Sequence, residues 1–223
     1  MNSKKQSEIF LSGEGDAWFK RNQVKKEVDF IKNIQDDPLI PLLEKINLPK
    51  GCDIITAEIG MGQGLRLEYL KEKYDWQVLG IDPSREAINS ASNLIDQVFV
   101  GTAESLPFDD SSLDLLIFGF CLYLCDRSDL FKIAAEAHRV LKKKSWIAIE
   151  DFWSSYPRAN KYKHLSGVYS YKADLSAMFS WHPSYVIFDH QLHRHNTKSY
   201  TDDCEEWVSS TLLRRFDPWV SSV

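Results

Sequence analysis

The segment from Ile54 to Tyr69, IITAEIGMGQGLRLEY, constrains the fold of this chain more than any other. An apolar run of the kind that forms a buried parallel strand is followed by three glycines and then at once by a helical pattern. Glycine lets the backbone turn sharply and lets a ligand approach without a Cβ in its path. The order of strand, glycine turn and helix is typical of the phosphate- or nucleoside-binding corner of a Rossmann-like unit.

The spacing of the glycines limits the choice of ligand. A dinucleotide fingerprint, G-x-G-x-x-G, would place its third glycine at Leu65. This chain instead has an acid-x-G-x-G-x-G pattern from Glu58 to Gly64. Asp82 ends a second apolar strand, where a ribose-binding carboxylate is expected about 20 residues further on. An ordinary strand-to-helix turn would explain the glycines alone, but Asp82 favours an adenosine ribose with free hydroxyls.

Length and composition predict one globular domain without a membrane or nucleic-acid partner. The chain has 223 residues, of which 43% are hydrophobic and 26% charged, as is ordinary for a soluble protein. No apolar run reaches the roughly 20 residues that span a bilayer, and the first residues show no signal-peptide core. We therefore expect a cytoplasmic protein. The net charge of −5 argues against a partner with a phosphate backbone. The oligomeric state cannot be read from the sequence.

Cysteines and histidines give no clear metal site, so no metal is predicted. The four cysteines form no CxxC pair and are expected to be buried free thiols. Three histidines near the end of the chain are two or three residues apart on one expected strand, so alternate members would share a face. A metal site there is the alternative interpretation, although no carboxylate partner stands out. These residues are Cys52, Cys121, Cys125, Cys204, His190, His193 and His195.

Strands alternate with helices as far as residue 150, which predicts a parallel sheet with helices on both faces. Two further strands, 185–193 and 206–213, lack a convincing crossover helix and suggest an antiparallel hairpin that finishes the sheet. Asp16 is expected to cap the first helix. The expected strands before residue 150 are 54–59, 77–82, 97–100, 113–118 and 146–150, and the expected helices are 16–34, 38–46, 84–92, 128–141 and one beginning at 65.

This pattern predicts a single domain that consists of four segments. An N-terminal helical cap (1–50) precedes the cofactor-binding core (51–151). An aromatic insertion or lid (152–183) comes next, and closing antiparallel strands (184–223) end the chain. The aromatic residues of the insertion would line an acceptor pocket or only pack within a lid.

The core resembles a class I S-adenosylmethionine-dependent methyltransferase. The matching pieces are AEIGMGQG, the strand end Ile81-Asp82, GTAESLPFDDSSLDLLIFGF and AHRVLKKKSWIAIED, which cover roughly residues 53–151 in the family's order. The resemblance implies an α/β, Rossmann-like fold with a seven-stranded, mostly parallel sheet whose last strand is antiparallel. It also implies S-adenosyl-L-methionine as cofactor and S-adenosyl-L-homocysteine as product.

The two ends of the chain resemble a narrower group, the methylases associated with pseudaminic acid and surface-glycan biosynthesis. The similar segments are SGEGDAWFKRN near the start and YKHLSGVYSYKADLSAMF with FDHQLHRHN near the end. The chain departs from that group in lacking a glycine beside His164 and in having Thr201-Asp202-Asp203-Cys204 before the last strand. The resemblance implies a sugar or nonulosonate-type acceptor in polysaccharide biosynthesis. Another small hydroxylated or carboxylated metabolite, or a non-catalytic cofactor-binding subunit, is the alternative.

Family resemblance also implies which residues hold the cofactor. The glycine turn would hold its methionine part, and Asp82 would accept both ribose hydroxyls. Residues 102–104 would line the adenine, although many relatives have Asp in place of Thr102, and residues 118–120 would cross beneath the sulfonium. The implied cofactor residues are Arg21, Glu58, Gly60, Met61, Gly62, Gly64, Asp82, Pro83, Thr102, Ala103, Glu104, Phe118, Gly119 and Phe120.

Acceptor and catalytic residues are expected around the insertion. A sugar hydroxyl is a poor nucleophile, and a general base would raise the rate about 10²–10⁴-fold. The candidates for this base are Asp151, His164 and His182, with His164 first because neutral imidazole accepts a proton near pH 7. His182, beside Pro183, would alternatively be only a loop residue. Asp151 would alternatively only hydrogen-bond the turn that follows it. The expected substrate-binding residues are Trp18, Asn22, Tyr123, Tyr162, Tyr171 and Lys172.

Methylation of a nucleic-acid base is not expected. Enzymes of that kind usually carry Asp/Asn-Pro-Pro-aromatic after the fourth strand, whereas this chain has Gly119-Phe120-Cys121-Leu122. The leading interpretation is therefore methyl transfer to a small molecule.

Overall fold

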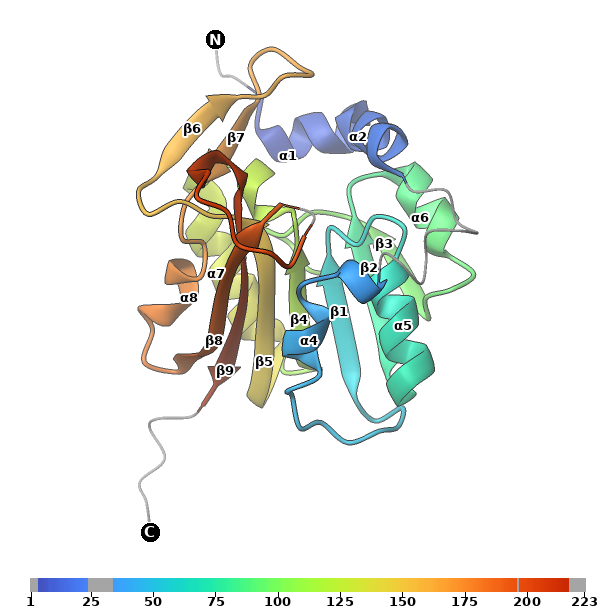
Figure 1. The fold of residues 1–223 in the computed structure, drawn as a ribbon. Helices are drawn as coiled ribbons and strands as arrows, with labels where there is room; N and C mark the ends of the chain where they lie inside the picture. The colour runs from blue at the N-terminus through green and yellow to red at the C-terminus, as the bar shows by residue number, and fades with distance from the viewer. Residues whose placement is uncertain (1–3, 24–33, 196, 217–223) are drawn as a thin grey trace.

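A seven-stranded sheet forms the centre of the molecule (Figure 1). The computed structural model describes residues 4–23, 34–195 and 197–216. The strand order is β3-β2-β1-β4-β5-β9-β8, in which the first five strands are parallel and β9 is antiparallel to both of its neighbours. This is the fold that the sequence predicts. The strands are β1 (Ile55–Ile59), β2 (Gln77–Asp82), β3 (Gln97–Val100), β4 (Leu113–Gly119), β5 (Leu141–Phe152), β8 (Tyr185–Arg194) and β9 (Trp207–Arg215).

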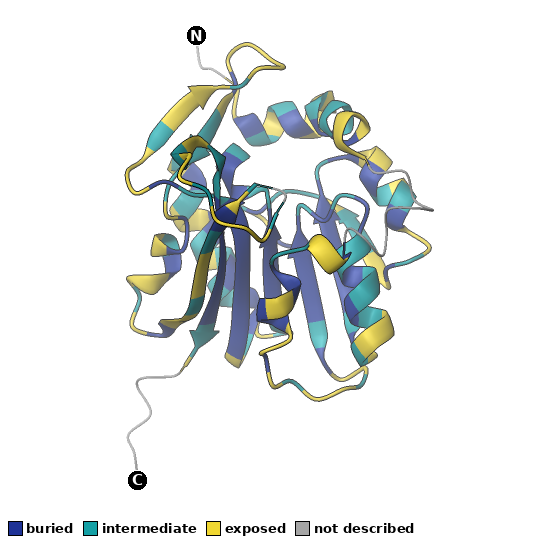
Figure 2. Ribbon diagram, in the orientation of Figure 1, coloured by how far each residue is buried: buried dark blue, intermediate teal, exposed yellow. Residues whose placement is uncertain are grey.

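Two apolar layers cover the faces of the sheet, because successive side chains of a strand point to opposite faces. Along β4, Leu116 and Phe118 join one cluster while Leu115 and Ile117 join the other. The first cluster includes residues of α7 (Leu130–Val140) and α8 (Ala177–Ser180), and the second includes residues of α4 (Ile40–Leu43) and α5 (Leu65–Tyr74). Figure 2 shows that the central strands are mostly buried and that most exposed residues lie on the helices and loops around them. The short helix α6 (Arg85–Ala91) packs on β2 and β3.

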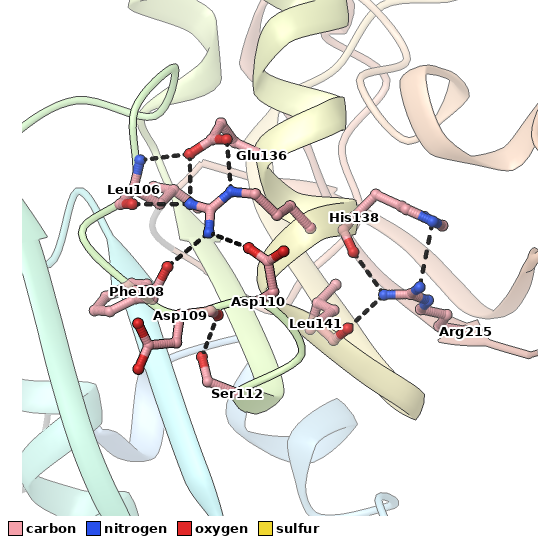
Figure 3. Close-up of polar contacts among 10 residues, drawn as sticks. Leu106, Phe108, Asp109, Asp110, Ser112, Glu136, His138, Leu141 and Arg215 are labelled. Carbon is pink, nitrogen blue, oxygen red and sulfur yellow. Dashed lines mark hydrogen bonds and ion pairs between the residues drawn. The ribbon is translucent and has the colours of Figure 1, made fainter.

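The loop from β3 to β4 is fixed by one arginine of α7. Arg139 donates to the carbonyl oxygens of Leu106 (3.0 Å) and Phe108 (2.7 Å), and it also binds the carboxylates of Asp110 and Glu136 (Figure 3). Glu136 in turn accepts a hydrogen bond from the backbone N–H of Leu106 at 2.8 Å. The preceding part of this loop, residues 101–105, lies at the carboxyl edge of the sheet, and these bonds hold it there.

The N-terminal segment crosses the carboxyl ends of the parallel strands (Figure 1). It consists of α1 (Gln6–Ile9), a π-helical turn (Phe10–Glu14) with Gly13 at φ 142°, and α2 (Gly15–Asn22). The helix predicted over 16–34 therefore begins earlier and ends as α2 at Asn22, because Gln23 is extended; residues 24–33 lie outside the described part. The helix predicted over 38–46 is shorter, a single turn in α4.

Asp16 does not cap its own helix, which corrects the prediction. It lies in the first turn of α2, where Asp16 Oδ1 accepts hydrogen bonds from Ser84 Oγ (2.7 Å) and the backbone N–H of Glu86 (3.1 Å). The neighbouring Gly15 is close to the same turn, since a Cβ there would lie 3.1 Å from the Ser84 nitrogen. The pair Gly15-Asp16 thus docks α2 onto the start of α6.

A two-stranded hairpin within the aromatic insertion was not predicted. Strands β6 (Arg158–Lys161) and β7 (Tyr169–Lys172) pair antiparallel outside the main sheet. β6 is largely exposed and β7 is mostly half-buried, and neither shows the alternation of buried and exposed residues that predicts a strand. Gln6 of α1 accepts from the backbone N–H of Tyr169 (2.6 Å) and donates to its carbonyl oxygen (3.1 Å). The hairpin and the N-terminal segment therefore lie side by side above the strand ends.

Two further observations bear on the predictions. None of the helices among the described residues is long and apolar enough to cross a membrane. All four cysteines are free, but Cys52 is exposed and the other three are half-buried, which corrects the expectation of four buried thiols.

Candidate active site

The glycine turn forms a cradle after β1. Gly60, Gly62 and Gly64 have φ values of 76°, 54° and 75°, a region that side-chain-bearing residues rarely adopt. A Cβ on Gly60 would lie 2.8 Å from the carbonyl oxygen of Gly119, whereas a Cβ on Gly62 would meet nothing within 4 Å. The turn is therefore packed against β4 on one side and open at its tip. Met61 is buried with its sulfur toward Gly80 and lines the cavity beside the turn, and its cofactor role stays a prediction.

Asp82 ties the end of β2 to the glycine turn. Its Oδ2 accepts from the backbone N–H of Gly62 (3.0 Å) and its Oδ1 from that of Ser84 (2.9 Å). Burial raises the pKa of this carboxyl to about 6, against the lowering effect of the two amide hydrogen bonds. Carboxylate oxygens have lone pairs for more than one donor each. Asp82 can thus order the turn and still accept hydrogen bonds from a ligand.

A cavity lies at the strand ends beneath the N-terminal segment, and we call it the strand-end cavity. Asp82 and Pro83 from the end of β2 line it together with residues of the β3–β4 loop and of the cover above. The residues predicted to contact the adenosine of the cofactor are thus brought together around one cavity; that they bind adenosine stays a prediction. Its principal residues are Phe10, Gly15, Trp18, Gly60, Asp82, Pro83, Thr102, Ala103, Glu104 and Phe120.

A second, larger space of about 1160 Å³, the hairpin cleft, lies between the strand ends and the β6–β7 hairpin. Binding sites for small molecules are typically about 300–1,000 Å³, so the cleft has room for one. All six residues predicted to bind the acceptor line it, and so does His164; that they bind a substrate stays a prediction. These residues are Trp18, Asn22, Tyr123, Tyr162, His164, Tyr171 and Lys172.

Arg21 links the N-terminal segment to the loop after β6. Its guanidinium donates to Glu14 Oε1 (2.6 Å) and to the hydroxyl of Tyr162 (2.9 Å). This bridge joins α2 to the loop after β6, and Tyr162 completes it by donating to Glu14 (3.0 Å). Arg21 thus holds the cover against the hairpin, and its predicted place near the cofactor or the acceptor stays a prediction.

Three consecutive residues at the end of β4 have different surroundings. The Phe118 side chain is fully buried in the core, 5.8 Å from the ring of Phe179, so it does not reach the site as predicted. Gly119 lies at the glycine turn, where a Cβ would meet Glu58 Oε1. Phe120 has a φ of 47° and packs its ring on Phe152 and His195. Its left-handed backbone directs this ring toward the cavities rather than the core.

Asp151 does not face the hairpin cleft as a base would. It is 1% exposed and accepts from the backbone N–H groups of Tyr123 (3.1 Å) and Phe152 (2.8 Å). Burial raises the pKa of Asp151 to about 7, against these hydrogen bonds. The structure therefore favours the alternative role, in which Asp151 shapes the turn η2 (Leu122–Leu124).

A buried charge cluster was not predicted from the sequence. It lies at a third cavity, the glycine-turn cavity, whose lining includes Glu58, Arg66, Asp37 and Gly119. Arg66 from the first turn of α5 donates to Glu58, to Glu150 (2.6 Å) and to Asp37 (2.9 Å). We call Arg66 and its three partners Glu58, Glu150 and Asp37 the Arg66 cluster. The sequence held one signal for this cluster: an arginine lies two residues after Gly64, and acidic residues lie near the ends of β1 and β5.

The histidines of β8 have separate surroundings. His193 is buried and hydrogen-bonds Ser210, while His190 bonds Thr211. His195, just past β8, lines the hairpin cleft, a position that was not predicted. Among the described residues no three His, Cys, Asp or Glu side chains are grouped to hold a metal ion.

Comparison with known proteins agrees with this geometry. Residues 57–149 match the family described as a methyltransferase domain. This match covers less than half of the chain, and it includes the glycine turn and Asp82. An uncharacterized methyltransferase of Bacillus subtilis (strain 168), YcgJ, is 31% identical over 107 residues. That match spans 44% of this chain and only 41% of the curated relative's length.

Solved structures share the fold of this chain at low sequence identity. The 1,6-didemethyltoxoflavin-N1-methyltransferase of Burkholderia thailandensis, solved with S-adenosylhomocysteine, has a TM-score of 0.66 at 15% identity and covers 95% of this chain and 87% of its own. The [4+2]-cyclase SpnF has a TM-score of 0.64 at 12% identity and covers 96% of each chain. Because a cyclase shares it, the fold alone does not define the reaction.

The residues present fit S-adenosylmethionine. The tip of the glycine turn is open at Gly62, and Asp82 stands beside it. Glu58 Oε2 is buried without a hydrogen-bond partner among the described residues, at a position that lines the glycine-turn cavity. A buried acceptor of this kind is costly unless a donor reaches it, and the cofactor's ammonium group is such a donor.

Proposed function

We propose that this protein transfers a methyl group from S-adenosylmethionine to a small molecule bound in the hairpin cleft. One observation carries the proposal: Trp18 and Phe120 line the strand-end cavity, the glycine-turn cavity and the hairpin cleft alike. The three spaces therefore meet at these two rings. A donor in the first two spaces and an acceptor in the third would meet at the same place.

Cofactor contacts follow from the lining residues. Asp82 would accept the ribose hydroxyls, while Thr102, Ala103 and Glu104 would surround the adenine. The open backbone of the glycine turn and Glu58 would hold the methionine part. The family match over residues 57–149 supports this arrangement, since it contains all of these positions.

Catalysis rests mainly on alignment. The bound cofactor supplies an electrophilic methyl group on a sulfonium centre. Trp18 and Phe120 would narrow the passage between the compartments and exclude water from it. Holding two reactants in line is worth roughly 7–11 kcal/mol of the barrier. His164 is the proposed proton acceptor, because it lines the cleft with its ring on Tyr162.

The acceptor is proposed to be sugar-derived, of a nonulosonate or related type. The cleft supports this with aromatic rings at Trp18, Tyr123 and Tyr171 beside polar groups such as Asn22 and Lys172. Aromatic rings pack against the C–H faces of a sugar while polar groups bind its hydroxyls. The resemblance of residues 12–22 and 162–179 to the glycan-associated methylases supports the same assignment.

Calorimetry with S-adenosylmethionine tests the cofactor site. The wild-type protein is expected to bind, and Asp82→Ala to bind at least about 100-fold more weakly, because a charge-assisted pair of hydrogen bonds is lost. Asp202→Asn, far along the chain from the glycine turn, is the matched control and should bind like the wild type. Unchanged affinity in Asp82→Ala would contradict the assignment.

A screen of free and nucleotide-linked sugars, with other hydroxylated and carboxylated metabolites, tests the acceptor. Mass spectrometry should detect one methylated product together with S-adenosylhomocysteine. His164→Ala is expected to lower turnover about 10²–10⁴-fold with unchanged cofactor affinity. Cofactor binding without any turnover across the screen would instead favour a non-catalytic cofactor-binding subunit.

A further inference from the structure

The Arg66 cluster forms part of the wall that the glycine-turn cavity and the hairpin cleft share. Arg66 lines both spaces, Asp37 does so too, Glu58 faces the first and Glu150 the second. The arginine side chain is 11% exposed, and those of Glu58 and Glu150 are each 4% exposed. The charges of this wall are therefore little screened by water, and each of them acts on both compartments.

Negative charge exceeds positive charge in this wall. One guanidinium serves three carboxylates, so the fully ionised cluster carries a formal charge of −2. Glu58 Oε2 has no hydrogen-bond partner among the described residues, although Glu58 is 3% exposed. A buried, unpartnered carboxylate oxygen beside excess negative charge points to a cationic ligand.

We propose that the Arg66 cluster makes the cofactor compartment selective for the cationic sulfonium over the neutral thioether that remains after methyl transfer. The inference rests on the cofactor placement proposed above. S-adenosylmethionine carries one positive charge more than S-adenosylhomocysteine, and the two are otherwise alike. Attraction to the cluster strengthens binding of the donor. Loss of that charge on transfer weakens binding of the product, so that donor displaces product.

Proton release accompanies this selectivity. Burial raises the pKa of Glu58 to about 7 and that of Glu150 to about 8, so both bind protons near neutral pH. A cation placed beside them favours the ionised form, so donor binding expels protons and product binding expels fewer. Donor affinity therefore rises with pH through this window. The other charged or titratable groups that face the two carboxyls or Asp37 are Arg66, Asp82, Asp151, Cys121 and His193.

Calorimetry with S-adenosylmethionine and S-adenosylhomocysteine on the full chain tests the inference. Titrations at about pH 6.5 keep the amino group of both ligands mostly protonated, so the sulfonium is the difference that remains. Repeating the titrations in buffers of different ionisation enthalpy gives the number of protons that each ligand releases on binding. In Glu150→Gln the ratio of donor to product affinity should fall about tenfold, since a buried carboxyl that ionises beside the bound donor is removed, and the extra proton release should shrink.

Controls separate this inference from the proposed function. Glu44→Gln removes a carboxylate that binds Lys73 on the surface and should leave the affinity ratio unchanged. If Glu150→Gln does not fold, Asp37→Asn serves in its place, because Asp37 is the more exposed partner of Arg66. Both ligands binding the wild type, with the same ratio in the variant and no difference in proton release, would overturn the inference alone. Neither ligand binding the wild type would overturn the proposed function as well.

Discussion

One residue at the end of β4, Gly119, determines whether the side chains of Glu58 and Arg66 have room to pair. Gly119 stands where a side chain would enter the space between Glu58 and Arg66, since its Cβ would lie 3.0 Å from Arg66 Nη1 and closer still to the glutamate. The glycine is therefore required by its neighbours rather than by its own backbone angles. This requirement could not be seen in the sequence, where Gly119 reads as one more small residue after a strand.

Gly119→Ala should destabilise the fold by roughly 3–5 kcal/mol, because separating a buried ion pair leaves an uncompensated charge. Urea-induced unfolding measures this free energy. Gly101→Ala is the matched control, since the nearest atom to its Cβ is Cγ2 of Ile81 at 3.3 Å. Equal stability of the two variants would show that the pair does not depend on Gly119.

Asp151→Ala should act on stability rather than on cofactor binding. The loss of a carboxylate that accepts two backbone N–H groups leaves these buried donors unpaired, at about 1–3 kcal/mol. Thermal unfolding should therefore show a lower midpoint, while calorimetry should show unchanged affinity for S-adenosylmethionine. A folded variant of unchanged stability would argue that the turn after β4 does not need Asp151.

At the scale of elements, the glycine turn and the parallel strands were predictable, but the cover above them was not. The strands of the core are long apolar runs with turn residues between them, and such local signals survive in the sequence. The hairpin β6–β7 and the start of α1 bury little, so their place depends on contacts such as Gln6 with Tyr169, 163 residues apart. Partners so distant leave no periodic trace in either segment.

Gln6→Ala should loosen the N-terminal cover. Gln6 is 4% exposed, and its side chain makes three hydrogen bonds, two to Tyr169 and one to the carbonyl oxygen of Leu124 (2.7 Å). Their loss should make amide hydrogen exchange in α1 and α2 about 10-fold faster or more. Glu8→Ala, on the exposed side of α1, is the control and should exchange like the wild type. Equal protection in both variants would mean that other contacts hold the cover.

For the whole molecule, four buried carboxyls make stability depend on pH. Burial raises the pKa of Asp82 to about 6, of Glu58 and Asp151 to about 7 and of Glu150 to about 8. The folded protein then binds more protons than the unfolded chain from about pH 4.5 upward, so these groups favour folding at low pH and lose that effect as pH rises through 6 to 8. Histidines with lowered pKa values, the buried His193 and the half-buried His138 among them, oppose this trend.

A comparison of variants isolates the carboxyl contribution. Between about pH 5 and pH 8 the unfolding free energy should fall less steeply in Glu150→Gln than in the wild type, because one titrating carboxyl is gone. Thermal melts across that range, without ligand, measure the two slopes. Parallel curves would contradict the raised pKa of Glu150. The sequence showed these acids, but not that the sheet would bury two of them, Glu58 and Glu150, around a single arginine.

The bond between Gln6 and the backbone of Tyr169 also has a consequence for biosynthesis. On the ribosome, the first helix emerges long before the segment that it must clasp. The nascent chain can therefore complete its sheet up to β5 while the opening above remains uncovered. Closure of the cover is then a late event of translation, and a ribosome stalled before residue 169 would carry a polypeptide whose amino-terminal helix is accessible to protease.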